Sequence, residues 1–442
     1  MSSTARVGLP DGNVHSKMPE QAFSDTVNIM PNKSRNYSLD KSKIKFLLLE
    51  GIHETAVELI KGHGYNSVEL LRRALTGDEL QAALKGVHFL GIRSRSQLDQ
   101  AALQAADRLT AVGCFCIGTN QVDLKAAAAH GVPVFNAPFS NTRSVAELAL
   151  AEAVLLLRGI PTRNAAAHRG QWIKSATHAH EARGKTIGII GYGHIGSQLG
   201  VLAEGLGMRV LYYDIEHKLP LGNASKCASL WEMLNESHVV SLHVPETPLT
   251  RNMADAEFLK SMRPGSFLIN ASRGHVVDID ALAESLGSGH LAGAAIDVFP
   301  LEPGSNKETF ESRLRGMDNV ILTPHIGGST MEAQENIALE VAGKLVHYSD
   351  NGTTRSAVNF PEVSLPDHEH ASRILHVHRN EPGVLQRINH VFSEHSVNVA
   401  SQYLETRDHI GYVVMDIETD DPASLLQNLR RIPSTIRARI LH

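Results

Sequence analysis

The sequence predicts an α/β protein in which two series of parallel strands precede a smaller C-terminal domain. From Ile44 onward, short apolar runs alternate with helical patterns, and such alternation produces parallel sheets with helices on both faces. Residues 372–442 instead follow the order βαββαβ, which is the split βαβ or ferredoxin-like arrangement. A linker rich in proline and polar residues, NFPEVSLPDHEH, separates the two parts.

The first series of elements is predicted from short apolar runs and the helical patterns between them. Strands are predicted at 44–51, 87–92, 109–115 and 132–136, with helices at 97–107 and 121–130. A longer amphipathic helix is predicted at about 144–159, with Ser144 as its N-cap. Glu147 stands three residues further on, at the spacing of a capping box.

The second series contains more strands, and the C-terminal part repeats nothing before it. Strands are predicted at 185–190, 208–213, 238–243, 266–270, 293–298 and 319–323, and a helix follows Ser329. The C-terminal domain is predicted as strand 373–378, helix 384–395, strands 397–404 and 410–418, helix 422–431 and strand 435–441.

Length and composition exclude several classes of protein. A chain of 442 residues indicates two or three domains, and its net charge of −5 argues against nucleic acid as a partner. No apolar window is long enough to span a membrane. Three cysteines make no disulfide framework, so we expect a reducing compartment, the cytoplasm. Residues 1–42 are polar and are expected to be disordered.

A glycine-rich turn in KTIGIIGYGHIG predicts a dinucleotide site. Gly191 allows a tight turn, Gly193 lets the backbone approach a pyrophosphate, and Gly196 lets the helix pack against the strand. The next strand, RVLYYD, ends at Asp214, at the distance of the acid that binds the adenosine ribose. Because its charge repels a 2′-phosphate, NAD is favoured over NADP.

Polar side chains follow three later strands and predict the chemistry. Arg273 follows FLINAS, Asp297 and Glu302 follow GAAI, and His325 follows VILTP. Ligands bind at the carboxyl ends of parallel strands, so these groups converge. A histidine base paired with a glutamate, beside an arginine that grips a carboxylate, suits oxidation of a 2-hydroxy acid. No cluster has the spacing of metal ligands, so no metal is expected.

Nearly all of the chain after residue 43 resembles the D-isomer-specific 2-hydroxyacid dehydrogenases. The motifs that carry the resemblance are IIGYGHIGSQLG, NASRGHVVDIDAL, HLAGAAIDVFPLEP and LTPHIGGSTMEAQENI. The resemblance implies two doubly wound parallel-sheet domains with the active site in the cleft between them. These are a Rossmann NAD domain at 143–325 and a discontinuous, flavodoxin-like substrate domain at 43–142 and 326–360. A linker at 361–371 then leads to an ACT regulatory domain at 372–442.

The resemblance also implies the roles of individual residues. Arg273, Glu302 and His325 form the catalytic trio. The implied NAD contacts are Gly191, Gly193, His194, Ile195, Gly196, Asp214, Ala271, Ser272, Arg273, Asp297, His325, Gly327 and Gly328. Within LTPHIGGST, we also expect Gly327 and Gly328 to adopt torsion angles that other residues resist and to form a hinge for closure of the cleft.

Among members of this family, the chain is most similar to those that oxidise 3-phospho-D-glycerate to 3-phosphohydroxypyruvate, at the start of L-serine biosynthesis. The phosphate group of this substrate is expected to bind Arg93, Ser94 and Arg95 in GIRSRSQL, and Asn141 is expected to assist. Reduction of 2-oxoglutarate to 2-hydroxyglutarate is an expected side activity. For the ACT domain, the resemblance implies L-serine inhibition through His378, Asn380 and Asn398, and a homotetramer joined by ACT–ACT and NAD-domain contacts.

Two other functions remain open from the sequence. The same chemistry could act on an unphosphorylated 2-hydroxy acid such as glycerate or lactate, but Arg93 and Arg95 would then have little to bind. Some members of this superfamily are NAD-sensing corepressors, and an intact catalytic trio does not exclude that role. An ACT domain favours a metabolic enzyme over a corepressor.

Overall fold

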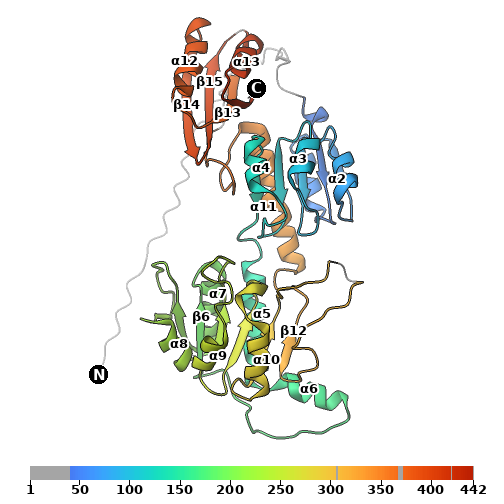
Figure 1. The fold of residues 1–442 in the computed structure, drawn as a ribbon, viewed down its shortest axis with the longest axis vertical. Helices are drawn as coiled ribbons and strands as arrows, with labels where there is room; N and C mark the ends of the chain where they lie inside the picture. Colours follow the sequence, from blue (N-terminus) through green and yellow to red (C-terminus); the bar gives the residue numbers. More distant parts are fainter. Residues whose placement is uncertain (1–39, 305–306, 367–371, 420, 442) are drawn as a thin grey trace, which may run out of the picture. The chain divides into compact units, whose positions relative to one another are not determined.

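The computed structural model describes residues 40–304, 307–366, 372–419 and 421–441. The expectation of disorder at the N-terminus falls mainly on residues 1–39, which lie outside these ranges, as do residues 367–371 of the expected linker. In the described part of the chain the strands form three sheets, two parallel and one antiparallel (Figure 1). No helix in that part combines the length and apolar character needed to cross a membrane.

The first sheet has the flavodoxin-like strand order β2-β1-β3-β4-β5, with every pair parallel. Its strands are β1 (Lys45–Leu48), β2 (Ser67–Leu70), β3 (Phe89–Ile92), β4 (Ala111–Cys114) and β5 (Val134–Asn136). The helices of this region are η1 (Lys41–Lys43), α1 (Thr55–Gly62), α2 (Gly77–Ala83), α3 (Gln100–Ala105) and α4 (Leu124–Ala129). Helix α11 (Met331–Asn351) contributes Val341 and Leu345 to the core of this sheet, so a late segment completes an early domain.

The second sheet has the order β12-β11-β10-β9-β6-β7-β8, which changes direction between β6 and β9 as in Rossmann folds. Its strands are β6 (Thr186–Ile190), β7 (Arg209–Tyr213), β8 (Ser225–Lys226), β9 (Val239–Leu242), β10 (Phe267–Asn270), β11 (Gly293–Ile296) and β12 (Val320–Leu322). Its helices are α5 (Thr142–Leu157), α6 (Ile160–His168), α7 (His194–Gly205), α8 (Leu230–Glu236), α9 (Ala256–Ser261), η2 (Gly274–Val276) and α10 (Ile279–Gly287).

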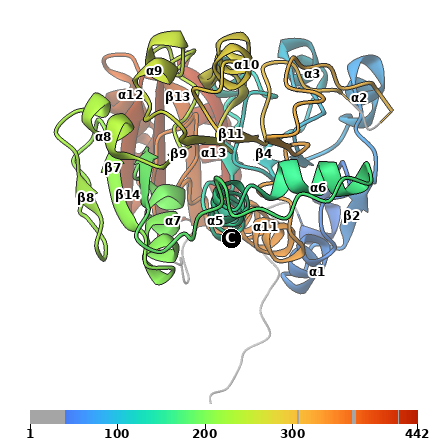
Figure 2. The same ribbon diagram turned by 90° about the horizontal axis from the view of Figure 1, so that it is seen from below.

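Helices cover both faces of the second sheet, as the alternating pattern predicts. Figure 2 shows α9 and α10 on one side of the strands and α5 and α7 on the other. Two separate hydrophobic cores agree with this view. Phe258 and Leu282 belong to one core, and Leu156 and Leu199 belong to the other. The central strands β6, β9, β10 and β11 are buried on both faces, which explains why they are nearly continuous apolar runs.

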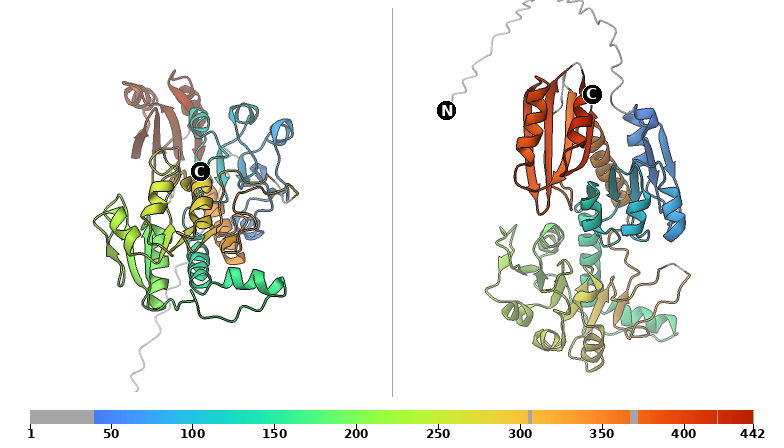
Figure 3. Two further views of the ribbon diagram at one scale, coloured as in Figure 1. Left: turned by 60° about the horizontal axis from the view of Figure 1, so that its bottom comes forward. Right: turned by 45° about the horizontal axis from the view of Figure 1, so that its top comes forward.

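The third sheet is antiparallel, with the order β14-β15-β13-β16 expected of a βαββαβ domain. Its elements are β13 (Ser372–Arg379), α12 (Val384–Glu394), β14 (Asn398–Arg407), β15 (Ile410–Glu418), α13 (Pro422–Arg430) and β16 (Thr435–Leu441). The right view of Figure 3 shows both helices, in red, over one face of this sheet. Ile388 of α12 and Leu425 of α13 share a core there with Val413.

One local prediction is wrong, and some elements of the structure were not predicted. The N-cap of the long helix α5 is Asn141, so Ser144 lies inside the helix, and the prediction of Ser144 as the cap is wrong. The hydroxyl of Ser144 instead pairs with Thr330 Oγ1 at 2.9 Å, a contact that the sequence pattern does not reveal. Strand β2 and helices α1 and α2 were not predicted. Strand β2 was missed because it is only partly buried and has no continuous apolar run.

Candidate active site

The glycine-rich turn joins β6 to α7 and has the geometry of a dinucleotide-binding turn. Gly191 has φ +89°, and a Cβ there would overlap the His243 carbonyl oxygen. A Cβ at Gly196 would overlap the carbonyl oxygen of Gly191, so the helix packs closely against the strand. At Gly193 a Cβ would meet nothing within 4 Å, which leaves open space at the helix N-terminus. That space suits a pyrophosphate group.

Asp214 lies directly after β7 and is held beside the same turn. Its Oδ2 accepts a hydrogen bond from Tyr192 N at 2.8 Å, and its Oδ1 accepts one from Glu216 N at 2.8 Å. The carboxylate is partly exposed, so each oxygen keeps capacity for a ribose hydroxyl. The turn and its acid therefore fit an adenine dinucleotide without a 2′-phosphate.

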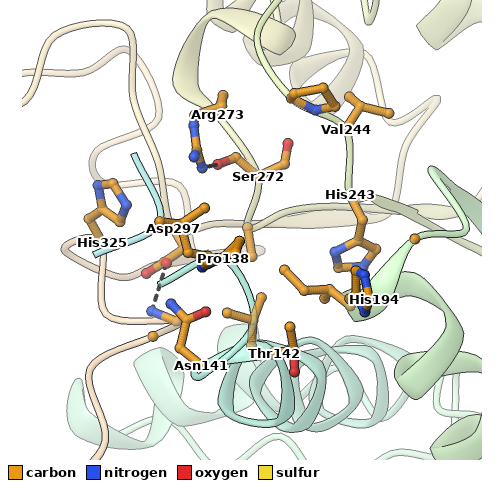
Figure 4. A pocket seen from close by; sticks show the side chains of 18 residues that line it. Pro138, Asn141, Thr142, His194, His243, Val244, Ser272, Arg273, Asp297 and His325 are labelled. Atoms are coloured by element: carbon orange, nitrogen blue, oxygen red, sulfur yellow. Dashed lines mark hydrogen bonds between the residues drawn. The ribbon is translucent and has the colours of Figure 1, made fainter. Parts of the chain in front are cut away.

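A cavity of about 380 Å³ opens beside this turn (Figure 4). Figure 4 shows Arg273, Asp297 and His325 on one side of the cavity and His194 and His243 on the other. The predicted residues that line it are Asn141, Gly193, His194, Ile195, Ala271, Ser272, Arg273, Asp297, His325, Gly327 and Gly328. Lining residues that the sequence did not single out are Ile117, Pro138, Thr142, Val145, His243, Val244 and Pro245.

His243 could have been found from the sequence, because it follows β9 as the other site residues follow their strands. Its side chain is partly buried, and burial lowers the pKa of His243 to about 4. Its Nε2 pairs with Ser241 Oγ at 2.8 Å. His243 is therefore a neutral wall of the cavity and is a poor candidate for the base.

The loop that carries Arg273 is organised by the side chain of Asn270 at the end of β10. Asn270 Oδ1 accepts hydrogen bonds from the backbone amide and the hydroxyl of Ser272, at 3.1 and 2.7 Å. Its Nδ2 donates to the Arg273 carbonyl at 3.1 Å. A guanidinium NH1 of Arg273 donates to the Ser272 carbonyl at 2.7 Å. The remaining donors of Arg273 are left to bind an anion in the cavity.

Asp297 follows β11 and holds the loop that carries His325. Its Oδ1 accepts from Thr323 Oγ1 at 2.7 Å and from Ile326 N at 2.8 Å, and its Oδ2 accepts from Gly327 N at 2.8 Å. The His325 amide also donates to the Asp297 carbonyl oxygen at 2.8 Å. These contacts enclose His325 on both sides, so the buried carboxylate determines where the imidazole stands.

His325 and Glu302 form the expected acid–base pair. Imidazole Nδ1 lies 2.8 Å from Glu302 Oε2, while Glu302 Oε1 accepts from Phe299 N at 3.1 Å. The hydrogen bond to Glu302 raises the pKa of His325, although burial opposes this. Burial alone would raise the pKa of Glu302, but the bond to His325 holds it below its ordinary value. With Nδ1 donating to the carboxylate, Nε2 of the neutral ring is free to accept a proton.

The expected torsion angles of Gly327 and Gly328 are wrong. Neither glycine lies in the left-handed region, and His325 itself has φ +55°. The glycines are required by close packing: a Cβ at Gly327 would stand 3.0 Å from Asp297 Oδ2, and one at Gly328 would overlap Asn141 Nδ2. The unusual backbone therefore belongs to the histidine and is held by the Asp297 contacts.

The loop after β3 carries the residues expected to bind phosphate. Arg93 is partly buried, whereas Ser94 and Arg95 are exposed, and none of the three lines the 380 Å³ cavity. Burial raises the pKa of Cys116, and the charges of Arg93 and Arg273 both act on this thiol in the opposite direction. The two guanidinium groups are therefore within electrostatic reach of one side chain, although they come from different sheets.

The expected effector residues do not meet within one chain. His378 is buried near the end of β13, opposite Gly411, and Asn380 Nδ2 donates to the Asp408 carbonyl at 3.3 Å. Asn398 opens β14 opposite Glu418, at the other end of the sheet. A ligand that touches all three residues therefore needs a second copy of the domain.

Glu152 is a further residue that the sequence did not single out for a role. It lies on α5 with 2% of its surface exposed, and neither carboxylate oxygen has a hydrogen-bond partner among the described residues. Burial raises its pKa to about 8, and the charge of Asp297 acts in the same direction. The neutral form of Glu152 is thus favoured at physiological pH, and its pKa responds to the charge of Asp297, which holds the loop that carries His325.

Comparison with known proteins gives consistent relatives. A family model described as D-isomer specific 2-hydroxyacid dehydrogenase, NAD binding domain, matches residues 150–327, and an AHAS small subunit-like ACT domain matches 374–437. The D-3-phosphoglycerate dehydrogenase of Haemophilus influenzae is 61% identical over 405 residues, which cover 92% of this chain and 99% of that protein. The enzyme of the same name from Dictyostelium discoideum is 48% identical over the same shares.

Solved structures support the fold of the two parallel-sheet domains. The D-lactate dehydrogenase of Aquifex aeolicus, complexed with NAD and lactic acid, has 26% identity and a TM-score of 0.60, and it covers 69% of this chain and 95% of its own. The TT0316 protein of Thermus thermophilus has 31% identity and a TM-score of 0.61, covering 69% of this chain and 96% of its own.

Proposed function

We propose a function from one premise: the chain belongs to the D-isomer-specific 2-hydroxyacid dehydrogenase family, and its cofactor is NAD. The enzyme oxidises 3-phospho-D-glycerate to 3-phosphohydroxypyruvate, the first committed step of L-serine biosynthesis. The observation that carries this proposal is the His325–Glu302 pair, whose imidazole lines the same cavity as Arg273 and the glycine-rich turn. The names of the relatives, which the chain matches over 92% of its length, supply the substrate.

The proposed steps follow from the groups around the cavity. Arg273 grips the substrate carboxylate and polarises the forming carbonyl at C2. Nε2 of neutral His325 accepts the hydroxyl proton, and Glu302 stabilises the imidazolium that results. When bound at the glycine-rich turn, NAD supplies the acceptor for the C2 hydride. Asp297 keeps His325 in position throughout.

The substrate phosphate is proposed to bind Arg93, Ser94 and Arg95, with Asn141 assisting from the cavity wall. Arginine suits this task because its planar fork matches two phosphate oxygens at once. Reduction of 2-oxoglutarate to 2-hydroxyglutarate uses the same base and arginine and is proposed as a side activity. The three free cysteines agree with a reducing compartment, and we place the enzyme in the cytoplasm.

Initial rates test the substrate assignment. The chain is assayed with NAD and 3-phospho-D-glycerate, D-glycerate or D-lactate, and in reverse with NADH and 2-oxoglutarate. We expect kcat/KM for the phosphorylated acid to exceed the others by at least about 100-fold, because two arginines lose their partner without phosphate. Equal turnover of lactate would refute the assignment. Recovery of chromatin partners without any turnover would favour a corepressor.

We further propose that L-serine inhibits the enzyme at a seam between ACT domains of two subunits in a homotetramer, with NAD-domain contacts joining the other pairs. The reason is the separation of Asn398 from His378 and Asn380 along one sheet, which a second copy can close. Pairing through the ACT sheets also covers the exposed edge strand β14.

Replacing Asn380 or Asn398 with alanine is expected to raise the serine concentration for half-inhibition by about tenfold, since each change removes amide hydrogen bonds to the effector. Uninhibited turnover should stay within about twofold of wild type. Asn389→Ala provides the control, because Asn389 is an exposed asparagine on α12 outside the predicted site. If serine still inhibits both variants normally, the effector binds elsewhere.

A further inference from the structure

We propose that Glu50 is a positioning residue: it binds the backbone of the loop and so orients the Arg93 and Arg95 side chains toward the substrate phosphate. The inference rests on the proposed function, because it concerns the same anion-binding loop. Glu50 follows β1 and does not line the cavity described above, so its effect must pass through the loop after β3.

The contacts between Glu50 and the loop are backbone hydrogen bonds. Glu50 Oε1 accepts from Arg93 N at 3.1 Å and from Ser96 N at 2.9 Å, and Oε2 accepts from Arg95 N at 3.0 Å. Only 4% of the Glu50 surface is exposed. One buried carboxylate therefore gathers three amides from four consecutive residues.

Glu50 is itself held in an uncommon conformation that aims its side chain at the loop. Its φ is +63°, in the left-handed region that few residues other than glycine adopt. The Glu50 amide donates to the Arg73 carbonyl at 3.1 Å, which ties this turn to the segment after β2. A conformation of this kind persists only where the surroundings hold it, and it indicates a functional constraint on this carboxylate.

Other contacts fix the opposite side of the loop. Gln121 Nε2 donates to the Arg93 carbonyl at 2.5 Å, and Leu75 N donates to Ser96 Oγ at 3.3 Å. The backbone of the loop is thus held from three separate segments. Within the described part of the chain, the guanidinium groups of Arg93 and Arg95 form no ion pair. The loop is rigid at its backbone and leaves its cationic side chains available.

Converging backbone amides form a concavity of the type that binds phosphate in other proteins. Here the carboxylate of Glu50 fills it, so a ligand phosphate cannot use these amides and must bind the side chains. The loop therefore recognises phosphate by the paired forks of Arg93 and Arg95, whose spacing depends on Glu50. Loss of the carboxylate would make the spacing between the Arg93 and Arg95 side chains less fixed, and it would leave the groups that react with C2 unchanged.

Glu50→Gln tests the inference, because it keeps the shape, removes the charge and turns an NH2 group toward the loop amides. We expect KM for 3-phospho-D-glycerate and the inhibition constant of inorganic phosphate to rise about tenfold, with kcat and the KM for NAD within about twofold. kcat/KM for D-glycerate should not change. Glu58→Gln, an exposed carboxylate on α1, is the matched control.

A double-variant comparison separates positioning from general destabilisation. In an Arg93→Ala/Arg95→Ala background, Glu50→Gln should raise KM no further, because the groups it positions are gone. Glu50→Asp keeps the carboxylate charge but moves it away from the loop amides, because the side chain is one methylene shorter. The KM of Glu50→Asp for 3-phospho-D-glycerate should therefore lie between those of wild type and Glu50→Gln. The rise in KM of Glu50→Asp above the wild-type value remains measurable if Glu50→Gln fails to fold.

The outcomes distinguish the two proposals. If wild type does not oxidise 3-phospho-D-glycerate, the proposed function fails before any variant is made. If wild type does so, an unchanged KM in Glu50→Gln, an equal loss with D-glycerate, or additive effects in the arginine-free background would each overturn the role of Glu50.

Discussion

Replacing His325 with alanine lowers kcat for oxidation of 3-phospho-D-glycerate by at least about 100-fold, the usual contribution of a positioned general base. The imidazole is the group whose Nδ1 is engaged by Glu302 at 2.8 Å and whose Nε2 remains free to take the hydroxyl proton. NAD should still bind, because the glycine-rich turn and Asp214 are formed by β6, α7 and β7 alone. Steady-state or stopped-flow kinetics measures kcat, and a fluorescence titration with NADH measures cofactor binding.

Glu302→Gln is the matched variant for His325, since it keeps the imidazole and removes only the carboxylate charge. His325 must be neutral to accept a proton, so kcat/KM rises with pH through the pKa of His325. Glu302 raises that pKa, and its loss should move the acid limb of the profile to lower pH. A normal kcat in His325→Ala, or an acid limb that stays in place in Glu302→Gln, contradicts the assigned roles.

Glu152→Gln abolishes a large dependence of stability on pH. Burial first, and the charge of Asp297 second, raise the pKa of Glu152 in the folded protein from an ordinary 4.5 to about 8. The stability associated with this raised pKa is complete below pH 4.5 and is lost as pH rises through about 8. The difference corresponds to roughly 4–5 kcal/mol of unfolding free energy. Glutamine cannot ionise, so this slope should disappear in the variant.

Urea denaturation between pH 5 and 9 measures the effect as the difference between wild type and Glu152→Gln. The difference should grow with pH in favour of the variant and level off above pH 8. Glu147→Gln is the control, because Glu147 lies on the same helix in an exposed ion pair with Arg143 and should change the slope little. A wild-type slope retained in Glu152→Gln would show that the buried carboxyl is already ionised.

The buried acid also links stability to catalysis. Above pH 8 an ionised Glu152 would repel Asp297, the carboxylate that holds Ile326, Gly327 and Thr323 around the catalytic base. Activity of the wild type at high pH should therefore fall before that of Glu152→Gln.

The chemistry of the site was predictable because its signals are local in the sequence. Gly191, Gly193, Gly196 and Asp214 come from one strand–helix–strand unit, whose geometry follows from backbone sterics. Arg273, Asp297 and His325 each stand directly after an apolar run, and parallel strands bring such ends together.

The mistaken predictions concern choices that local pattern does not decide. Ser144 has the residue type and spacing of a cap, yet the N-cap of α5 is Asn141 and the helix begins at Thr142. Ser144 lies inside the helix, where its hydroxyl pairs with Thr330. Gly327 and Gly328 were expected to adopt torsion angles that other residues resist, yet neither lies in the left-handed region. Their small size instead lets Asp297 and Asn141 approach.

By itself the sequence determined the α/β class and the dinucleotide turn, and it placed Arg273, Glu302 and His325, the proposed catalytic trio, after predicted strands. Periodicity, turn residues and strand ends follow from the covalent chain. Only the tertiary structure decided what surrounds Glu50 and Glu152. Glu50 meets amides 43–46 positions along the chain, and Glu152 lies near Asp297 on another element. Hydrogen bonds from remote amides fix the orientation of Glu50, and burial raises the pKa of Glu152. No local sequence pattern records which segments will meet.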